Sequence, residues 1–230
     1  MADENEDMRV LPDVAQAIEG VVAGVGRTVW TARMTDARVL YLIACAAPPA
    51  LHIRTGIEKA QAAGWDVCLV VSPSARRWID KDMADLERLT GHVVRSAYKL
   101  PEEVDVLPSA DAMLVAPATF NTVNKWAAGI SDTLALGLIT EAIGLRVPLV
   151  ALPYLNQAQA AHPQFGRSVS FLRECGVTVL LGGEGFVPHV PKHGDLTSYP
   201  WDAALRALPN GSDVPSRSEE IEASYRRSTP

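Results

Sequence analysis

Hydroxyl and amide side chains gather in residues 116–132, where an apolar run passes through Pro117 into a stretch with helical spacing. The polar residues at the start of that stretch are Thr119, Asn121 and Thr122. Such groups can bind a flat ring rich in nitrogen and oxygen atoms, and the dipole of a helix favours an anion near its first turn. Lys125 and Asp132 follow, either as part of the same site or as a solvated or subunit-facing ion pair. This stretch is the strongest candidate for a ligand site.

Two shorter loops carry weaker signals. Ser72 and Ser74 stand beside an expected helix start, which suits a phosphate or, more simply, an ordinary N-cap. The loop 45–49 has small residues and no G-x-G-x-x-G pattern, so a dinucleotide site is not predicted there. A closely approaching ligand and a plain tight turn explain those small residues equally well.

The segment 153–163 adds an amide and two ring side chains. Asn156 can bind a polar group of a substrate, and Tyr154 can flank an aromatic cofactor. His162 has the chemistry of a catalytic base. A structural role inside a helix is favoured for it, because it lies well into a helical pattern and away from the preceding strand.

The elements that must position these groups alternate along the chain. Apolar runs predict strands at 39–44, 66–71, 92–95, 111–116, 148–152 and 177–181. Helical patterns lie near 51–63, from about 75, at 121–143 with Gly129 as a point of close packing, and near 156–174. This alternation predicts an α/β fold with a doubly wound parallel sheet of about six strands. Ligands of such sheets bind at the carboxyl ends of the strands, which is where the polar loops fall.

The composition favours a small molecule as the partner, with no nucleic acid, membrane or metal. The net charge is -6 and the basic residues are scattered, whereas nucleic-acid binding depends on clustered Lys and Arg. The apolar stretch 41–51 is interrupted by two prolines and is shorter than the ~20 residues of a membrane span. Cys45, Cys68 and Cys175 are too dispersed for a disulfide framework or a zinc site. The acidic first residues lack a signal-peptide pattern, so a cytoplasmic protein is expected.

Three parts are expected along the chain. Residues 1–37 form an extension with one amphipathic helix at about 12–25, residues 38–205 form the body, and residues 206–230 form a polar, mobile tail.

Two segments resemble a known family. Residues 116–132 resemble the A-P-x-x-x-N-T-x-x-K-x-A-x-G-I-x-D segment of the homo-oligomeric flavin-containing cysteine decarboxylases, which include phosphopantothenoylcysteine decarboxylase and the peptidyl-cysteine decarboxylases. Residues 153–163 resemble the family's P-x-M-N-x-x-M-W-x-H-P segment, with Leu155 and Gln159 in place of the two methionines. The match runs in order over about 38–181.

The resemblance implies a Rossmann-like, flavodoxin-like three-layer sandwich that binds FMN at a subunit interface of a homotrimer or of a dodecamer of trimers. The phosphate and ribityl chain would be held by Cys45, Ala46, Ala47, Ser72 and Ser74. The remaining flavin contacts would come from Ala116, Pro117, Ala118, Thr119, Phe120, Asn121, Thr122 and Tyr154. Asn156 matches the asparagine that binds the substrate carboxylate.

Three positions depart from the family pattern. Glu103 lies near the place of the family's catalytic His and is either a base or, more simply, a solvated loop residue. Residues 180–186 have no counterpart of the family's reducing Cys, and residues 45–47 replace its G-S-I/V.

The leading hypothesis is an FMN-binding flavoprotein, acting as an oxidoreductase or divergent decarboxylase on a small carboxylate-bearing substrate. One alternative is a non-catalytic FMN-binding regulatory or partner subunit. The other is a phosphopantothenoylcysteine decarboxylase whose base has moved to a position such as His92 or His189.

Overall fold

The computed structural model describes residues 37–183, 185–196 and 198–209, all within the unit that begins at Ala37. The helix predicted at 12–25 and the predicted tail from 210 onward lie outside these residues. Packing continues past the predicted boundary at 205, because Leu208 is buried and the Pro209 carbonyl accepts a hydrogen bond from Arg38 Nη1 at 2.7 Å. Among the described residues, no helix is both long and apolar enough to cross a membrane.

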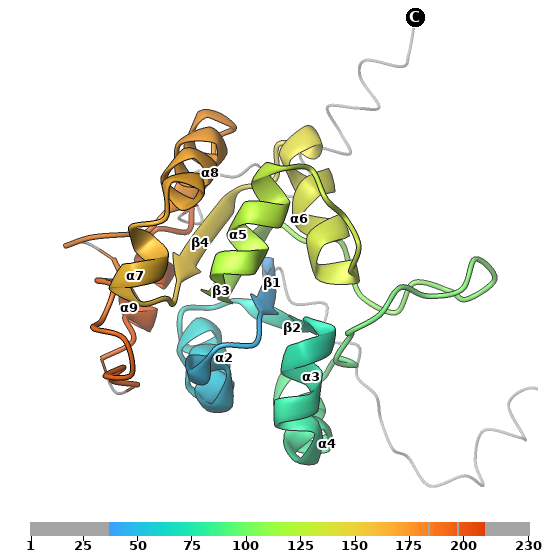
Figure 1. Cartoon of the computed structure of the whole chain (residues 1–230). Helices are drawn as coiled ribbons and strands as arrows, with labels where there is room; N and C mark the ends of the chain where they lie inside the picture. Colours follow the sequence, from blue (N-terminus) through green and yellow to red (C-terminus); the bar gives the residue numbers. More distant parts are fainter. Residues whose placement is uncertain (1–36, 184, 197, 210–230) are drawn as a thin grey trace, which may run out of the picture. The chain divides into compact units, whose positions relative to one another are not determined.

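A five-stranded parallel sheet in the order β2-β1-β3-β4-β5 forms the centre of the fold (Figure 1). Its strands are β1 Val39–Ala44, β2 Asp66–Val71, β3 Ala112–Ala118, β4 Leu149–Pro153 and β5 Thr178–Val179. Every residue of β1, β3 and β4 is buried, as apolar strands covered on both faces should be. The predicted parallel α/β fold is therefore confirmed.

Helices connect the strands and cover both faces of the sheet (Figure 1). They are η1 Pro48–His52, α2 Ile53–Ala62, α3 Pro73–Ile79, η2 Asp80–Asp82, α4 Met83–Thr90, α5 Phe120–Ala127, α6 Leu134–Leu145, α7 Gln157–Ala160, α8 Pro163–Glu174 and α9 Trp201–Arg206. Helix α2 packs against α9, and α5 packs against α6 and α8. The chain runs from β1 outward to β2 and then back to β3 on the other side of β1. Such a reversal opens a crevice at the carboxyl ends of β1 and β3.

The prediction of about six strands was too high, because residues 92–95 form only an isolated bridge between Val70 and Arg95. Two backbone N–H groups that would have to donate to a neighbouring strand donate to side chains instead. The N–H of His92 donates to Thr90 Oγ1 at 3.2 Å, and the N–H of Val94 donates to Glu87 Oε1 at 3.1 Å. The segment is therefore held mainly by the end of α4, and only Arg95 bonds to the sheet, donating to the Leu69 carbonyl at 3.2 Å and accepting from the N–H of Val71 at 2.8 Å.

Both long predicted helices are divided in the structure. The prediction of close packing at Gly129 was wrong, because a Cβ there would meet nothing within 4 Å. Gly129 has φ +70°, which ends the helical path after α5, and Thr133 then caps α6. Pro163 begins α8, because it is well suited to a first helical position and unsuited to a helix interior. His162 is thus the N-cap of α8, with its Nδ1 accepting from the N–H of Gln164 at 3.1 Å.

Replacing Thr140 by valine is expected to raise the free energy of unfolding by roughly 1 kcal/mol. Thr140 Oγ1 in α6 is buried without a hydrogen-bond partner in the described part of the chain, so the hydroxyl loses its hydration without compensation. Chemical denaturation measures the change. Thr90→Val is the matched control and should lower stability, because Thr90 Oγ1 donates to the Leu86 carbonyl at 3.0 Å. A loss of stability in Thr140→Val would contradict the expectation.

Candidate functional site

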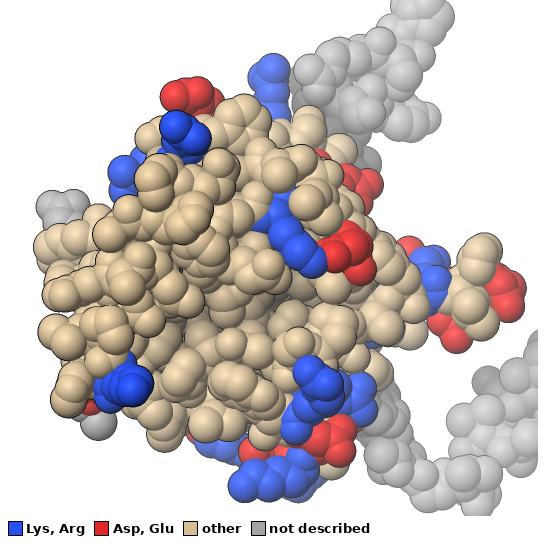
Figure 2. Space-filling view, viewed as in Figure 1, with Lys and Arg blue, Asp and Glu red and all other residues tan. Residues whose placement is uncertain are grey.

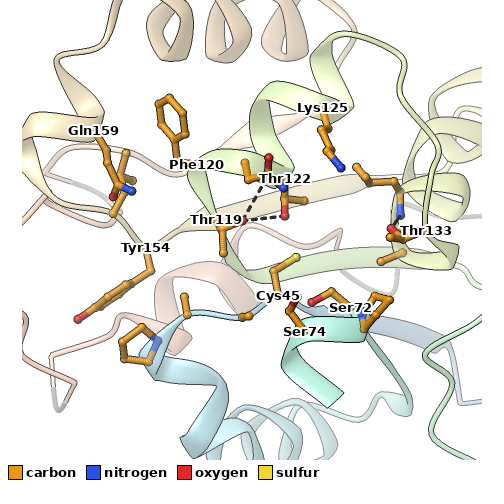
Figure 3. Close-up of a pocket in the computed structure, with 18 of the residues that line it drawn as sticks. Cys45, Ser72, Ser74, Thr119, Phe120, Thr122, Lys125, Thr133, Tyr154 and Gln159 are labelled. Carbon is orange, nitrogen blue, oxygen red and sulfur yellow. Dashed lines mark hydrogen bonds between the residues drawn. The ribbon is translucent and has the colours of Figure 1, made fainter. Parts of the chain in front are cut away.

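A cavity of about 640 Å³ opens where β1, β2, β3 and β4 end (Figure 3). That volume is within the range of about 300–1,000 Å³ that is common for small-molecule sites. The lining residues are Cys45, Ala46, Ala47, Pro48, Ser72, Pro73, Ser74, Thr119, Phe120, Asn121, Thr122, Lys125, Thr133, Ala135, Leu136, Tyr154, Leu155, Asn156, Gln159 and His189. The loops that follow four strands therefore meet at one place, as the sequence predicts for a parallel sheet.

One end of the cavity carries hydroxyl groups and a cation (Figure 3). Ser72 caps α3 by accepting from the N–H of Ala75 at 3.2 Å, and a hydroxyl that accepts in this way keeps its own proton for donation. Thr133 caps α6 in the same way. Lys125 is paired with Asp132, which was one of the two alternatives left open by the sequence, and Lys125 also lines the cavity. This end is suited to an anionic group.

The middle of the cavity is organised around the start of α5. Thr119 caps this helix by accepting from the N–H of Thr122 at 3.1 Å, and the two threonine hydroxyls are 2.8 Å apart. The N–H of Cys45 donates to the Pro117 carbonyl at 3.0 Å, which ties the loop after β1 to the end of β3. The floor of the site is thus fixed by hydrogen bonds.

Cys45 lines the cavity as a neutral thiol. Burial raises the pKa of its thiol, and hydrogen bonds from the Thr122 side chain and the Thr119 backbone oppose that rise without cancelling it. Because the thiolate is the reactive form of cysteine, this residue is a poor nucleophile where it stands.

The other end of the cavity is aromatic and carries amide groups (Figure 3). The ring of Tyr154 lies 4.9 Å from that of Phe186 and 5.1 Å from that of His189, centroid to centroid. Burial and the negative charge of Asp195 raise the pKa of the Tyr154 hydroxyl, so it remains protonated. The His189 carbonyl accepts from the N–H of Gln157 at 2.8 Å, which joins this wall to the loop after β4.

His189 is held in one tautomer. Its Nδ1 lies 2.8 Å from the Val190 carbonyl oxygen, which can only accept, so Nδ1 carries the proton and Nε2 of the neutral ring has a free lone pair. Gly194 allows the neighbouring groups to come close. A Cβ at that position would lie 3.2 Å from His189 Nε2 and 2.2 Å from the Tyr154 hydroxyl oxygen.

The predicted site residues fall into two groups. Those that line the cavity are Cys45, Ala46, Ala47, Ser72, Ser74, Thr119, Phe120, Asn121, Thr122, Tyr154 and Asn156. Ala116, Pro117 and Ala118 do not line it, because they are buried in β3 below its floor.

Glu103 and two of the histidines lie outside the lining. Glu103 is on an exposed loop, where its carboxylate accepts from the N–H of Leu100 at 2.9 Å. His92 lies 2.8 Å from Asp66, and His162 caps α8. Sequence reasoning missed Thr133, Ala135, Leu136 and Gln159, of which Thr133 had a usable signal as a hydroxyl residue just after a glycine break.

The family model described as Flavoprotein matches residues 31–202. The chain belongs to the Flavoprotein family. Its membership supports flavin binding, and decarboxylases are among its relatives.

Similar sequences include the phosphopantothenoylcysteine decarboxylase of Mus musculus, 40% identical over 73 residues that cover 32% of this chain and 35% of the relative. A cysteine/cysteine sulfinic acid decarboxylase from an unknown prokaryotic organism is 35% identical over 82 residues, covering 36% of this chain and 22% of the relative. These matches thus span about a third or less of the curated relatives. Among solved structures, the peptidyl-cysteine decarboxylase EpiD has a TM-score of 0.59 at 23% identity, over 76% of this chain and 99% of that one, which shows the shared fold.

Proposed function

We propose that this flavoprotein binds FMN in the cavity at the carboxyl ends of its strands and acts as an FMN-dependent decarboxylase or oxidoreductase on a small carboxylate-bearing substrate. The observation that carries the proposal is the composition of the cavity, which joins a hydroxyl and lysine end to an amide and imidazole end. Two relatives named as decarboxylases of cysteine or of a cysteine conjugate make cysteine derivatives the first substrates to test.

The lining fits FMN in size and in chemistry. Ser72, Ser74 and Lys125 offer donors and a positive charge for the phosphate. Thr119 and Phe120, at the start of α5, offer a polar edge and an aromatic face for the ring system. When bound, FMN supplies the two-electron redox chemistry, for which the neutral Cys45 thiol is not suited.

The residues of the chain would position the substrate and handle a proton. Asn156 lies at the amide end, where its side chain would bind the substrate carboxylate. His189 Nε2 has the free lone pair needed to accept a proton from the substrate. The packed rings of Tyr154 and Phe186 form an apolar wall that limits the entry of water.

Association of several copies, as a homotrimer or a larger assembly of trimers, is part of the proposal. The loop between α4 and β3 extends away from the sheet (Figure 1) and carries exposed apolar side chains. They are Tyr98, Leu100, Val104 and Val106, and Val104 is 81% exposed. Apolar side chains grouped on one projecting loop are typical of a contact between protein chains.

Purified protein is expected to show the visible absorbance of an oxidised flavin, and mass spectrometry of the released cofactor is expected to give FMN. Under anaerobic conditions, N-acetylcysteine or another small acid from a panel of cysteine derivatives should bleach the flavin, while the matching carboxamides should not. A colourless protein that cannot be reconstituted with FMN would overturn the cofactor assignment. Equal bleaching by acids and carboxamides would overturn the substrate class.

A further inference from the structure

A cluster of three rings connects the cavity to the start of α8. The ring of Phe120, which lines the cavity (Figure 3), lies 5.8 Å from the ring of Phe165, centroid to centroid, with 20° between their planes. The imidazole of His162 lies 5.7 Å from the Phe120 ring, with 80° between their planes. Stacked and edge-to-face arrangements at such distances are favourable for aromatic pairs. Phe120 is thus packed against one ring in parallel and against a second ring at nearly a right angle.

The two supporting rings belong to a helix that is tied to α5. Phe165 is only 1% exposed, and Ser168, one turn further along α8, is buried as well. The Ser168 hydroxyl donates to Asn124 Oδ1 of α5 at 2.7 Å. Because this bond joins the first turns of α8 to α5, the His162 ring at the helix start keeps its place beside Phe120.

The side chain of His162 makes two separate interactions within residues 37–183, 185–196 and 198–209. Its Nδ1 accepts from the N–H of Gln164, which caps α8, and its ring packs on Phe120. Neither is an ion pair, and Figure 2 shows a largely uncharged surface around α7, which directly precedes His162. The cap needs only an acceptor atom, which asparagine, aspartate or serine usually supplies. The contact of the ring with Phe120 is therefore independent of the cap.

We infer that His162 is a positioning residue that holds the Phe120 ring in place as a wall for the ring system of FMN. This inference rests on the proposed function in taking that ring system to lie against Phe120. Phe120 is only half-buried, so without the His162 ring its side chain can turn toward the space that His162 occupied. FMN would then have to order this side chain on binding, which lowers the affinity. His162 thus contributes to the site without lining it.

Two substitutions separate the ring of His162 from its cap. His162→Asn keeps a side-chain oxygen that can cap α8 and removes the ring. His162→Phe keeps an aromatic ring beside Phe120 and removes the capping acceptor. If the ring supports the site, only the first substitution affects FMN, whereas a residue that acts through the cap alone gives the opposite pattern.

The measurement is the dissociation constant of FMN for each variant, together with the visible circular dichroism of the bound flavin, which depends on how rigidly its surroundings are held. His162→Asn should bind FMN about two- to tenfold more weakly, as expected when one more side chain has to be ordered on binding. Its visible circular dichroism should be smaller than that of the wild type. His162→Phe should match the wild type in both, while its denaturation midpoint falls because α8 loses its cap.

The double variant His162→Asn with Phe120→Leu tests whether the effect passes through Phe120. Leucine removes the ring that His162 supports, so adding His162→Asn to Phe120→Leu should change the dissociation constant of FMN by less than about twofold. The same loss of affinity in both backgrounds would show that His162 does not act through Phe120.

Two results with the single variants would also overturn the inference. One is a His162→Asn protein that binds FMN as tightly as the wild type, and the other is a His162→Phe protein that binds it as weakly as His162→Asn. A failure of the proposed function is seen separately, because the wild type itself then binds no FMN, and the inference falls with it.

Discussion

Replacing His189 by glutamine is expected to lower the turnover of the carboxylate substrate by about 10²–10⁴-fold, the range typical for loss of a general acid or base. The His189 ring donates through Nδ1 to the Val190 carbonyl at 2.8 Å, which leaves Nε2 as the group that can take a proton. A glutamine amide can keep a hydrogen bond to that carbonyl but has no nitrogen that titrates in water. Steady-state kcat with the best acid of the substrate panel measures the effect.

The matched control is His193→Gln, on the same segment. His193 is exposed and does not line the cavity, so its replacement should leave kcat unchanged. Both variants should retain FMN, since neither histidine belongs to the hydroxyl and lysine end of the cavity. A His189→Gln protein with a kcat within a few-fold of the wild type would remove His189 from the reaction.

The parts of the site that follow the strands could be predicted from the sequence. Apolar runs of six residues such as 39–44 and 66–71, alternating with helical patterns, are typical of parallel strands covered on both faces, and the polar residues after them then meet at one edge. Ser72, Thr119 and Asn156 were found in this way, because each caps the helix that follows its strand. Local capping chemistry and ligand binding use the same residue types.

The wall that carries His189 could not be predicted, because nothing local fixes it. The segment is joined to the sheet by single contacts, such as the isolated bridge between Asn156 and His189 and the ring packing of Phe186 on Tyr154. Helix α9 was missed for a related reason. It has only six residues, and its position depends on Trp201 packing against a glycine of α2 far away in the sequence.

The contact between Trp201 and Gly56 leads to the second prediction with a large expected effect, a loss of stability. Gly56→Ala is expected to lower the free energy of unfolding by roughly 1–2 kcal/mol, although alanine is intrinsically better than glycine in a helix by about 1 kcal/mol. A Cβ at Gly56 would lie 2.6 Å from Cζ3 and 2.8 Å from Cη2 of Trp201, whose ring is buried and rigid. The overpacking therefore exceeds the gain in helix propensity, and chemical denaturation would show a lower midpoint.

Gly166→Ala is the control that measures the gain in helix propensity without a packing clash. Gly166 lies inside α8, and a Cβ there would meet nothing within 4 Å, so this variant should be more stable than the wild type by up to about 1 kcal/mol. A destabilised Gly166→Ala, or a Gly56→Ala protein as stable as the wild type, would contradict the argument.

The double variant Gly56→Ala with Trp201→Phe identifies the neighbour responsible. The smaller phenylalanine ring makes room for the new methyl group, so the double variant should lose less stability than the sum of the two single changes. If the two losses simply add, the methyl group does not press on Trp201, and the close packing of α2 on α9 is not what requires glycine at position 56.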